Sequence, residues 1–261
     1  MEILQLTRKE MSQLLLCLNG AREDSPLTIL REAWSSTHQH AIQNGQSFSA
    51  FITTSLSPIF EKLIKADKTE RGLSLHDIVA LGNQIEYTHF SVTAVQNWVK
   101  RDMKEWIGTP RNGKKYSIEQ AALLYIVEDL KATLDFESIR KLFSLIFNNP
   151  EDHKDDLINP IDLYAAYSSI FEEMDADNDH IVDTDTAAVQ STGARAKPMM
   201  DSLIQIKARD FADTLTHLNA DQKEAIIHTI VIAILSIQSA FFQTLSRRSL
   251  NAALFLRNLH S

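Results

Sequence analysis

Cysteine, proline and glycine are all scarce in this sequence. The single cysteine, Cys17, cannot form a disulfide within the chain, which favours a reducing cytosol and argues against a thiolate metal sensor. Only 6 prolines and 7 glycines occur in 261 residues, so turn signals are few. This shortage predicts long helices joined by short loops and argues against a many-stranded sheet. The first residues carry charges within their apolar stretch, so we expect no signal peptide.

Positive charge is also scarce overall, but it is concentrated in one segment. The formal net charge is -8, which argues against a protein that coats nucleic acid without specificity. Residues 97–115 nevertheless hold six basic and two acidic side chains, a net charge of +4, which leaves -12 for the remainder. Because screening limits the reach of exposed charge to about 8–10 Å in physiological salt, this local excess decides which surface meets an anionic partner.

Hydrophobic periodicity predicts an all-α, predominantly helical fold with one small two-stranded wing. Capping-box patterns at Thr7 with Glu10 and at Ser117 with Gln120 mark two helix starts, and Asp135 is the predicted N-cap of a third helix. We divide the chain into an N-terminal helical region, a central domain, and a C-terminal helical region that contains a flexible acidic linker. These parts are residues 1–72, 73–147, 148–261 and, for the linker, about 175–197.

A short helix in the central domain carries two contrasting faces. At 100° per residue its apolar stripe comprises Val92, Val95, Val99 and Met103. The outward residues are amide, hydroxyl and basic: Thr93, Asn97, Lys100, Arg101 and Lys104, with Gln96 on a flank. Asn and Gln pair with adenine edges, Arg pairs with guanine, and Lys pairs with guanine or phosphate, so this face suits a major groove. Trp98 lies between the two faces, and we expect it to pack in the core.

The segment that follows, TPRNGKKYS from Thr109 to Ser117, predicts a basic hairpin. Asn112-Gly113 is a strong hairpin-turn signal, and Arg111, Lys114 and Lys115 surround it. A basic hairpin beside a recognition helix is a wing. The simpler interpretation is that this helix face and this loop are exposed to solvent and bind no partner.

The order helix, turn, helix, basic hairpin, capped helix, helix resembles the winged-helix domain of MerR-type transcription regulators. The matching residues are Pro110-Arg111, Gly113, Lys114-Lys115, Tyr116-Ser117 and the run LDFESIRKLF from Leu134. Gln96–Lys100 with GKKYS is also similar to a Gram-positive bacterial family with a domain of unknown function. Its pattern is Asn-Asn-Tyr-Val-Lys followed by Pro-x-x-Lys-Lys-Tyr-Ser. The resemblance covers about Leu73 to Phe147, less than a third of the chain.

This resemblance implies a bacterial transcription regulator that binds double-stranded DNA as a homodimer. Arg111 and Tyr116 would contact phosphate, supported by Lys114 and Lys115. The recognition helix departs from the MerR pattern around Trp98, so no target sequence carries over. Dimerisation would use a helix C-terminal to the domain, either Ile161–Phe171 or the long apolar helix from about Asp221. The flanking helical regions would bind an unknown small-molecule or protein effector.

A non-enzymatic helical scaffold, whose winged helix contacts protein, is the alternative. No phosphate loop or Ser/His/Asp order favours an enzyme, and we expect no cofactor. Asp175–Asp179 resembles the start of a calcium loop, but His180 and Thr186 stand where that loop requires Gly and Glu, so we expect no metal site.

The apolar run Ala225–Phe242 lacks Asp, Glu, Lys and Arg over eighteen residues, which is the lower limit for a membrane span. Its internal Ser, Thr, Gln and His side chains favour a buried bundle or dimer helix. We therefore expect a cytoplasmic protein that does not cross a membrane.

Overall fold

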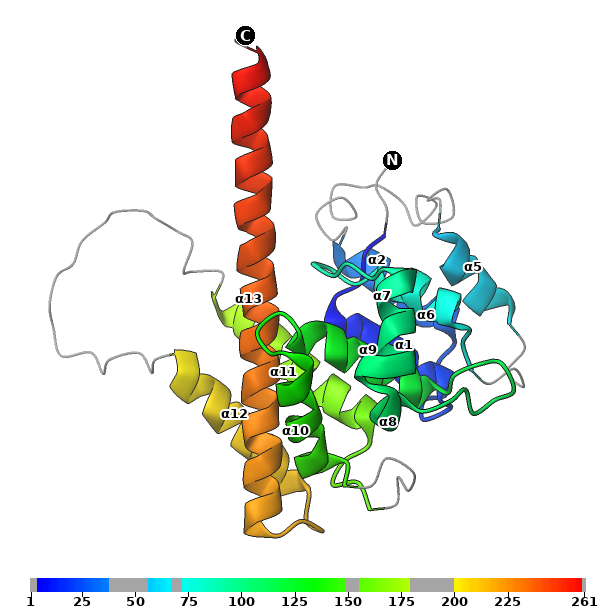
Figure 1. Ribbon diagram of the computed structural model, residues 1–261, viewed down its shortest axis with the longest axis vertical. Helices are drawn as coiled ribbons and strands as arrows, with labels where there is room; N and C mark the ends of the chain where they lie inside the picture. Colours follow the sequence, from blue (N-terminus) through cyan, green and yellow to red (C-terminus); the bar gives the residue numbers. More distant parts are fainter. Residues whose placement is uncertain (1–3, 38–55, 67–71, 149–154, 179–199, 260–261) are drawn as a thin grey trace, which may run out of the picture.

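The computed structural model shows a predominantly helical protein (Figure 1). It describes residues 4–37, 56–66, 72–148, 155–178 and 200–259. The helices of the first half are α1 (Arg8–Leu18), α2 (Pro26–Thr37), α5 (Pro58–Lys65), α6 (Leu75–Gly82), α7 (Val92–Asn97), the π-helix η1 (Trp98–Asp102) and α8 (Lys104–Ile107). The helices of the second half are α9 (Ile118–Leu130), α10 (Phe136–Ile146), α11 (Pro160–Asn178), α12 (Met200–Thr214) and α13 (Ala220–Leu259).

The helix starts that the sequence predicts are confirmed. Thr7 and Ser117 each accept a hydrogen bond from the backbone N–H three residues on, and the third residue returns one, which completes both capping boxes. Asp135 accepts from the backbone N–H of Ser138. Ser74 forms a further capping box with Asp77 at the start of α6. Such caps satisfy backbone N–H groups that the first helical turn leaves without partners.

The centre of the molecule is α9, which is buried on nearly every side. A helix that is apolar all round must be covered all round, and α1, α8, α11 and α13 pack against it. Three fully buried tyrosines, Tyr125, Tyr164 and Tyr167, contribute large aromatic surfaces to the α9–α11 contact. This packing gives the candidate interface a rigid support.

The N-terminal region packs directly on the central and C-terminal helices. The backbone of Leu6 forms a parallel bridge with Ile85, in the loop that precedes α7. Arg8 of α1 forms a buried ion pair with Asp129 of α9, with 2.8 Å between Nη2 and Oδ1. The Tyr167 hydroxyl of α11 donates to the other oxygen of Asp129 at 2.8 Å. Burial by itself lowers the pKa of Arg8, but the charge and hydrogen bond of Asp129 hold it above its ordinary value.

The last helix, α13, has two distinct halves. Its first half packs against α9, α10, α11 and α12, and its middle, as far as Arg248, borders the loop before α7. Only the C-terminal end extends beyond the rest of the molecule as a single helix (Figure 1). Forty residues correspond to about 60 Å. Ala220–Phe255 is the one helix in the described ranges with the length and composition for a membrane span, but 44% of its most apolar window is already buried in protein. That burial fits a bundle helix as well as a membrane helix.

The two-stranded wing is present only as a turn. In the described ranges no strand forms, and the pairing in this segment consists of single antiparallel bridges between Asn112 and Lys115 and between Leu73 and Tyr116. The expected acidic linker is described only at its start, where α11 continues through Asn178; residues 179–197 lie outside the described residues, as do His180 and Thr186.

Candidate nucleic-acid interface

Helices α6 and α7 are joined by a loop that is fixed by polar contacts at both ends. The Asn83 side chain donates to the Phe90 carbonyl at 3.0 Å and accepts from the Phe90 N–H at 2.9 Å. Gly82 ends α6 where an added Cβ would lie only 2.6 Å from the Phe90 ring. Glycine at this point therefore lets the loop cross close to α6, and the crossing sets the direction of α7.

The predicted recognition helix is not a regular α-helix, which corrects the 100° spacing assumed for residues 98–102. Trp98–Asp102 forms a π-helical turn, closed by a 2.8 Å hydrogen bond from Met103 N–H to the Trp98 carbonyl. The wider turn reduces the rotation between successive residues, so Trp98 and Val99 both face inward. Such turns within helices occur often at functional sites.

Trp98 packs in the core, as predicted from its place between the two faces. Its residue is 5% exposed, and its ring lies against Phe90 and Phe136. Lys131 Nζ lies 5.4 Å from the centre of the indole ring, within the range of a cation–π contact. Trp98 is thus a packing residue that holds the π turn against α9 and α10.

Most predicted base-reading residues are at the surface. Thr93, Asn97, Lys100, Arg101 and Lys104 are exposed, and Gln96 is half-buried. Arg101 is 76% exposed and pairs with Asp102 through Nε at 2.7 Å. Asp102 is one of the two acidic side chains in the basic segment, and this ion pair is its contact in the structure. An Arg101 that contacts a base must first exchange Asp102 for that base.

The basic loop turns one residue later than the predicted Asn112-Gly113 turn. Asn112 and Lys115 exchange two backbone hydrogen bonds of 3.0 Å, so Gly113 and Lys114 are the central residues. Gly113 has φ of 67°, which glycine adopts without strain. A positive φ at the first central residue alone is typical of a type II′ hairpin turn. The turn presents Arg111 and Lys114 to solvent, with Lys115 half-buried.

Tyr116 differs from the other predicted contact residues because it is largely buried. Its residue is 8% exposed, and its backbone exchanges hydrogen bonds with Leu73 at 2.8 and 2.9 Å. Burial raises the pKa of the Tyr116 phenol. Tyr116 thereby ties the basic loop to the segment before α6, and its burial leaves little of the side chain for the predicted phosphate contact.

Gln120 fixes the base of the basic loop, a role that its capping-box position alone did not reveal. Its side-chain amide donates to the carbonyls of Ile107 and Thr109 at 2.6 and 2.8 Å, and its oxygen accepts from the Ser117 N–H. Gly108, with φ of 69°, makes the turn that brings those two carbonyls together. The loop is therefore anchored to the first turn of α9.

The π turn is anchored from α10. Arg140 Nη1 donates to the Asp102 carbonyl at 2.7 Å, a carbonyl at the end of the π turn. Trp106 of α8 packs edge-on against Phe143 of α10. Both contacts link residues far apart in the sequence, so only the folded chain could identify Arg140 as a support of the interface.

No metal site is expected from the sequence, and the calcium-like segment is described only through Asn178. Among the described residues no group of three or more His, Cys, Asp or Glu side chains is arranged to hold a metal ion. Asp175–Asn178 form the last turn of α11, and the remainder of the calcium-like segment lies outside the described residues.

Comparison with known proteins finds a family match that includes this surface. The profile described as "Domain of unknown function (DUF1836)" matches residues 67–168, which include the whole candidate interface. The "Uncharacterized protein YkrK" of Bacillus subtilis (strain 168) is 37% identical over 252 residues, covering 95% of this chain and 97% of YkrK. The chain belongs to the YkrK family. No solved structure matches it.

The alignment with YkrK includes all three regions of the chain, so the family shares more than the central domain. The DUF1836 segment extends past Phe147 to Ser168, within α11. It therefore includes Tyr164 and Tyr167, which pack against α9. In this chain the supporting layer behind the candidate interface is thus part of the matched segment.

Proposed function

We propose that this chain is a transcription regulator that reads duplex DNA through α7 and η1 and holds the DNA backbone with the loop Arg111–Lys115. The observation that carries the proposal is the sorting of side chains along one continuous segment. The large apolar residues of Val95–Ile107 are buried, while Asn97 and the basic residues between them are exposed and Gln96 is half-buried. A surface that gathers positive charge in an acidic protein suits a polyanionic partner.

The two parts of this surface carry different chemistry. The basic loop offers cations on a tight turn, which suits phosphate contacts that set register without reading sequence. The α7 surface offers Thr93, Gln96 and Asn97, whose side chains suit base edges. Arg101 is held by Asp102 and is less available. We therefore assign affinity to the loop and sequence preference mainly to α7.

Asn97→Ala is expected to relax sequence preference more than it weakens overall binding. One bidentate amide–adenine pair discriminates against a wrong base by about 1–3 kcal/mol, so the ratio of specific to non-specific affinity should fall about 5- to 100-fold. Fluorescence anisotropy with genomic duplex fragments, selected by wild-type protein, measures both affinities. Asn251→Ala, at an exposed asparagine of α13, is the matched control.

Two outcomes contradict this assignment. Equal loss of specific and non-specific binding in Asn97→Ala removes the base-reading role of that residue. If wild-type protein shows no salt-dependent binding to any duplex, DNA binding itself is rejected and the interaction-scaffold function replaces it, since phosphate contacts impose a salt dependence.

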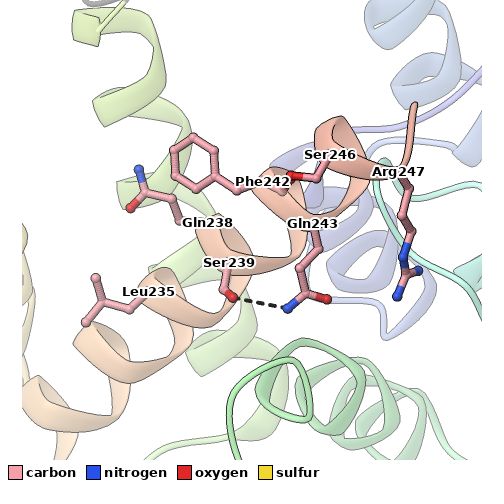
Figure 2. Close-up of a pocket in the computed structure, with 7 residues that line it drawn as sticks. All are labelled: Leu235, Gln238, Ser239, Phe242, Gln243, Ser246 and Arg247. Carbon is pink, nitrogen blue, oxygen red and sulfur yellow. Dashed lines mark hydrogen bonds between the residues drawn. The ribbon is translucent and has the colours of Figure 1, made fainter. Parts of the chain in front are cut away.

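We further propose that the partner of the exposed face of α13 is a second copy of the chain. The exposed apolar side chains of this helix include Leu235, Phe242, Leu245, Leu250 and Phe255. Leu235 and Phe242 are seven residues apart and Leu245 follows three residues later, so these three apolar side chains match the spacing of a coiled-coil seam; Gln238, Ser249 and Ala252 continue the same two rows. Figure 2 shows Leu235, Gln238 and Phe242 on one side of α13, with Gln243 and Arg247 on the other.

A second copy fits the proposed function because a single small domain rarely offers enough area for specific recognition, and two-fold sites supply two. Size-exclusion chromatography with light scattering should give twice 29.5 kDa for the wild type. Leu235→Ser/Phe242→Ser should shift the mass to the monomer without unfolding, because both side chains are exposed. A monomeric wild type, or a variant that remains dimeric, contradicts this interface.

A further inference from the structure

A polar cleft of about 460 Å³ lies between the loop before α7, the C-terminal end of α9 and the middle of α13. Pockets of a few hundred cubic ångströms are the usual size for small-molecule sites. The charged residues that line it are Arg8, Glu128, Asp129, Lys131, Arg247 and Arg248. The basic members outnumber the acidic ones four to two, in a chain whose net charge is -8.

The charges in the cleft divide into paired and available groups. Arg8 is neutralised by Asp129 at 2.8 Å, and Lys131 lies 3.3 Å from Glu128. Each of these pairs combines one positive and one negative side chain. Arg247 and Arg248 of α13 therefore give the cleft its excess of positive charge. Guanidinium groups favour carboxylate or phosphate oxygens, to which they donate charge-assisted hydrogen bonds.

Glu128 supplies the opposite chemistry. Its side chain is 9% exposed, and its Oε2 atom has no partner of good hydrogen-bond geometry in the described part of the chain. Burial raises the pKa of Glu128 to about 7, although Lys131 and the backbone N–H of His89 favour the ionised carboxylate. Oε2 lies 3.3 Å from Lys131 Nζ, but a buried carboxyl oxygen without a well-aligned hydrogen bond favours a further hydroxyl or amino donor.

From this geometry we infer that the cleft is a binding site for a small organic anion that carries phosphate or carboxylate groups together with a hydroxyl or amino group. The acidic groups contact Arg247 and Arg248, and the donor contacts Glu128. An anion that lacks a hydroxyl or amino group makes no contact with Glu128. The cleft residues come from four parts of the chain, which are the start of α1, the loop before α7, the end of α9 and α13, so binding depends on their assembled arrangement.

The site lies beside the loop that leads into α7. Tyr87 has φ of 60°, which is uncommon for a residue other than glycine. Its ring is packed edge-on against Phe241, 4.9 Å between centres, and Arg248 lies 6.0 Å from the ring centre. An anion in the cleft competes with Tyr87 for Arg248. Binding therefore shifts the loop and, on the basis of the proposed DNA-binding function, the affinity of α7 for DNA.

Isothermal titration calorimetry of the full chain at constant ionic strength tests the site without DNA. Glycerol 3-phosphate and citrate, titrated separately, distinguish the phosphate source from the carboxylate source. We expect saturable binding of at least one probe, with one molecule per chain. Arg247→Gln/Arg248→Gln should weaken that binding at least tenfold. Lys65→Gln/Lys141→Gln, which removes two exposed cations from α5 and α10, should leave it unchanged.

Absence of saturable binding by both probes overturns the site, as does unchanged affinity in Arg247→Gln/Arg248→Gln. DNA affinity is then measured separately by anisotropy, with and without the bound probe. Probe binding without any DNA binding supports the site and rejects the proposed function. DNA binding without probe binding supports the proposed function and rejects the site. DNA affinity that is the same with and without bound probe rejects the link through Tyr87.

Discussion

Replacing Arg111, Lys114 and Lys115 together by alanine is expected to weaken binding to duplex DNA of every sequence by about a hundredfold at about 0.15 M salt. Each phosphate contact releases counterions, so the loss of three contacts should also reduce the slope of log affinity against log salt by about 2.7. The ratio of specific to non-specific affinity should change little, because phosphate contacts do not read sequence. Anisotropy at several salt concentrations measures all three quantities.

The matched control for this variant is Lys65→Ala/Lys141→Ala/Arg209→Ala. These three cations are exposed on α5, α10 and α12, so the control has the same net charge as the loop variant. Equal weakening in both would assign the effect to overall charge. Unchanged binding in the loop variant would reject the basic loop as a DNA contact. Arg111 and Lys114 are exposed and Lys115 is half-buried, so the loop variant should lose little thermal stability relative to the wild type.

Asp129→Ala is expected to lower the free energy of unfolding by about 3–5 kcal/mol. Arg8 stays charged at every physiological pH, and it is 4% exposed, so the variant leaves a buried cation without its counterion. Because this pair joins the N-terminal region to the α9–α11 core, α1 should also separate more readily from the core. Urea unfolding followed by circular dichroism measures the loss, and hydrogen exchange over α1 measures the separation.

Two variants separate the ion pair from the rest of its network. Tyr167→Phe removes only the 2.8 Å hydrogen bond to Asp129 and should cost about 1 kcal/mol. Arg8→Met/Asp129→Leu replaces both charges and should be clearly more stable than Asp129→Ala, since no buried charge remains. If the double variant is as unstable as Asp129→Ala, lost packing and not the unpaired Arg8 explains the effect.

Local sequence signals predicted the helix starts well and the shape of the interface less well. The capping residues Thr7, Ser117 and Asp135 accept hydrogen bonds from N–H groups three residues further on. Because this contact is local, the sequence predicts it. The 100° rule missed the π turn at Trp98 because that turn depends on contacts with Phe90, Phe136 and Lys131. The Asn112-Gly113 signal located the hairpin to within one residue but did not predict that no strand would form.

By itself the sequence determined the helical class, the starts of the principal helices, the core position of Trp98 and the exposure of Asn97 and the basic loop. These features depend on short-range hydrogen bonds and on the period of apolar residues, which neighbours in the chain specify. Tertiary structure alone decided three others: the Arg8–Asp129 pair, the Gln120 and Arg140 anchors, and the cleft beside Tyr87. Each of these features joins residues that are distant in the chain. The local period of apolar residues does not predict which buried polar groups come into contact when other helices cover α9.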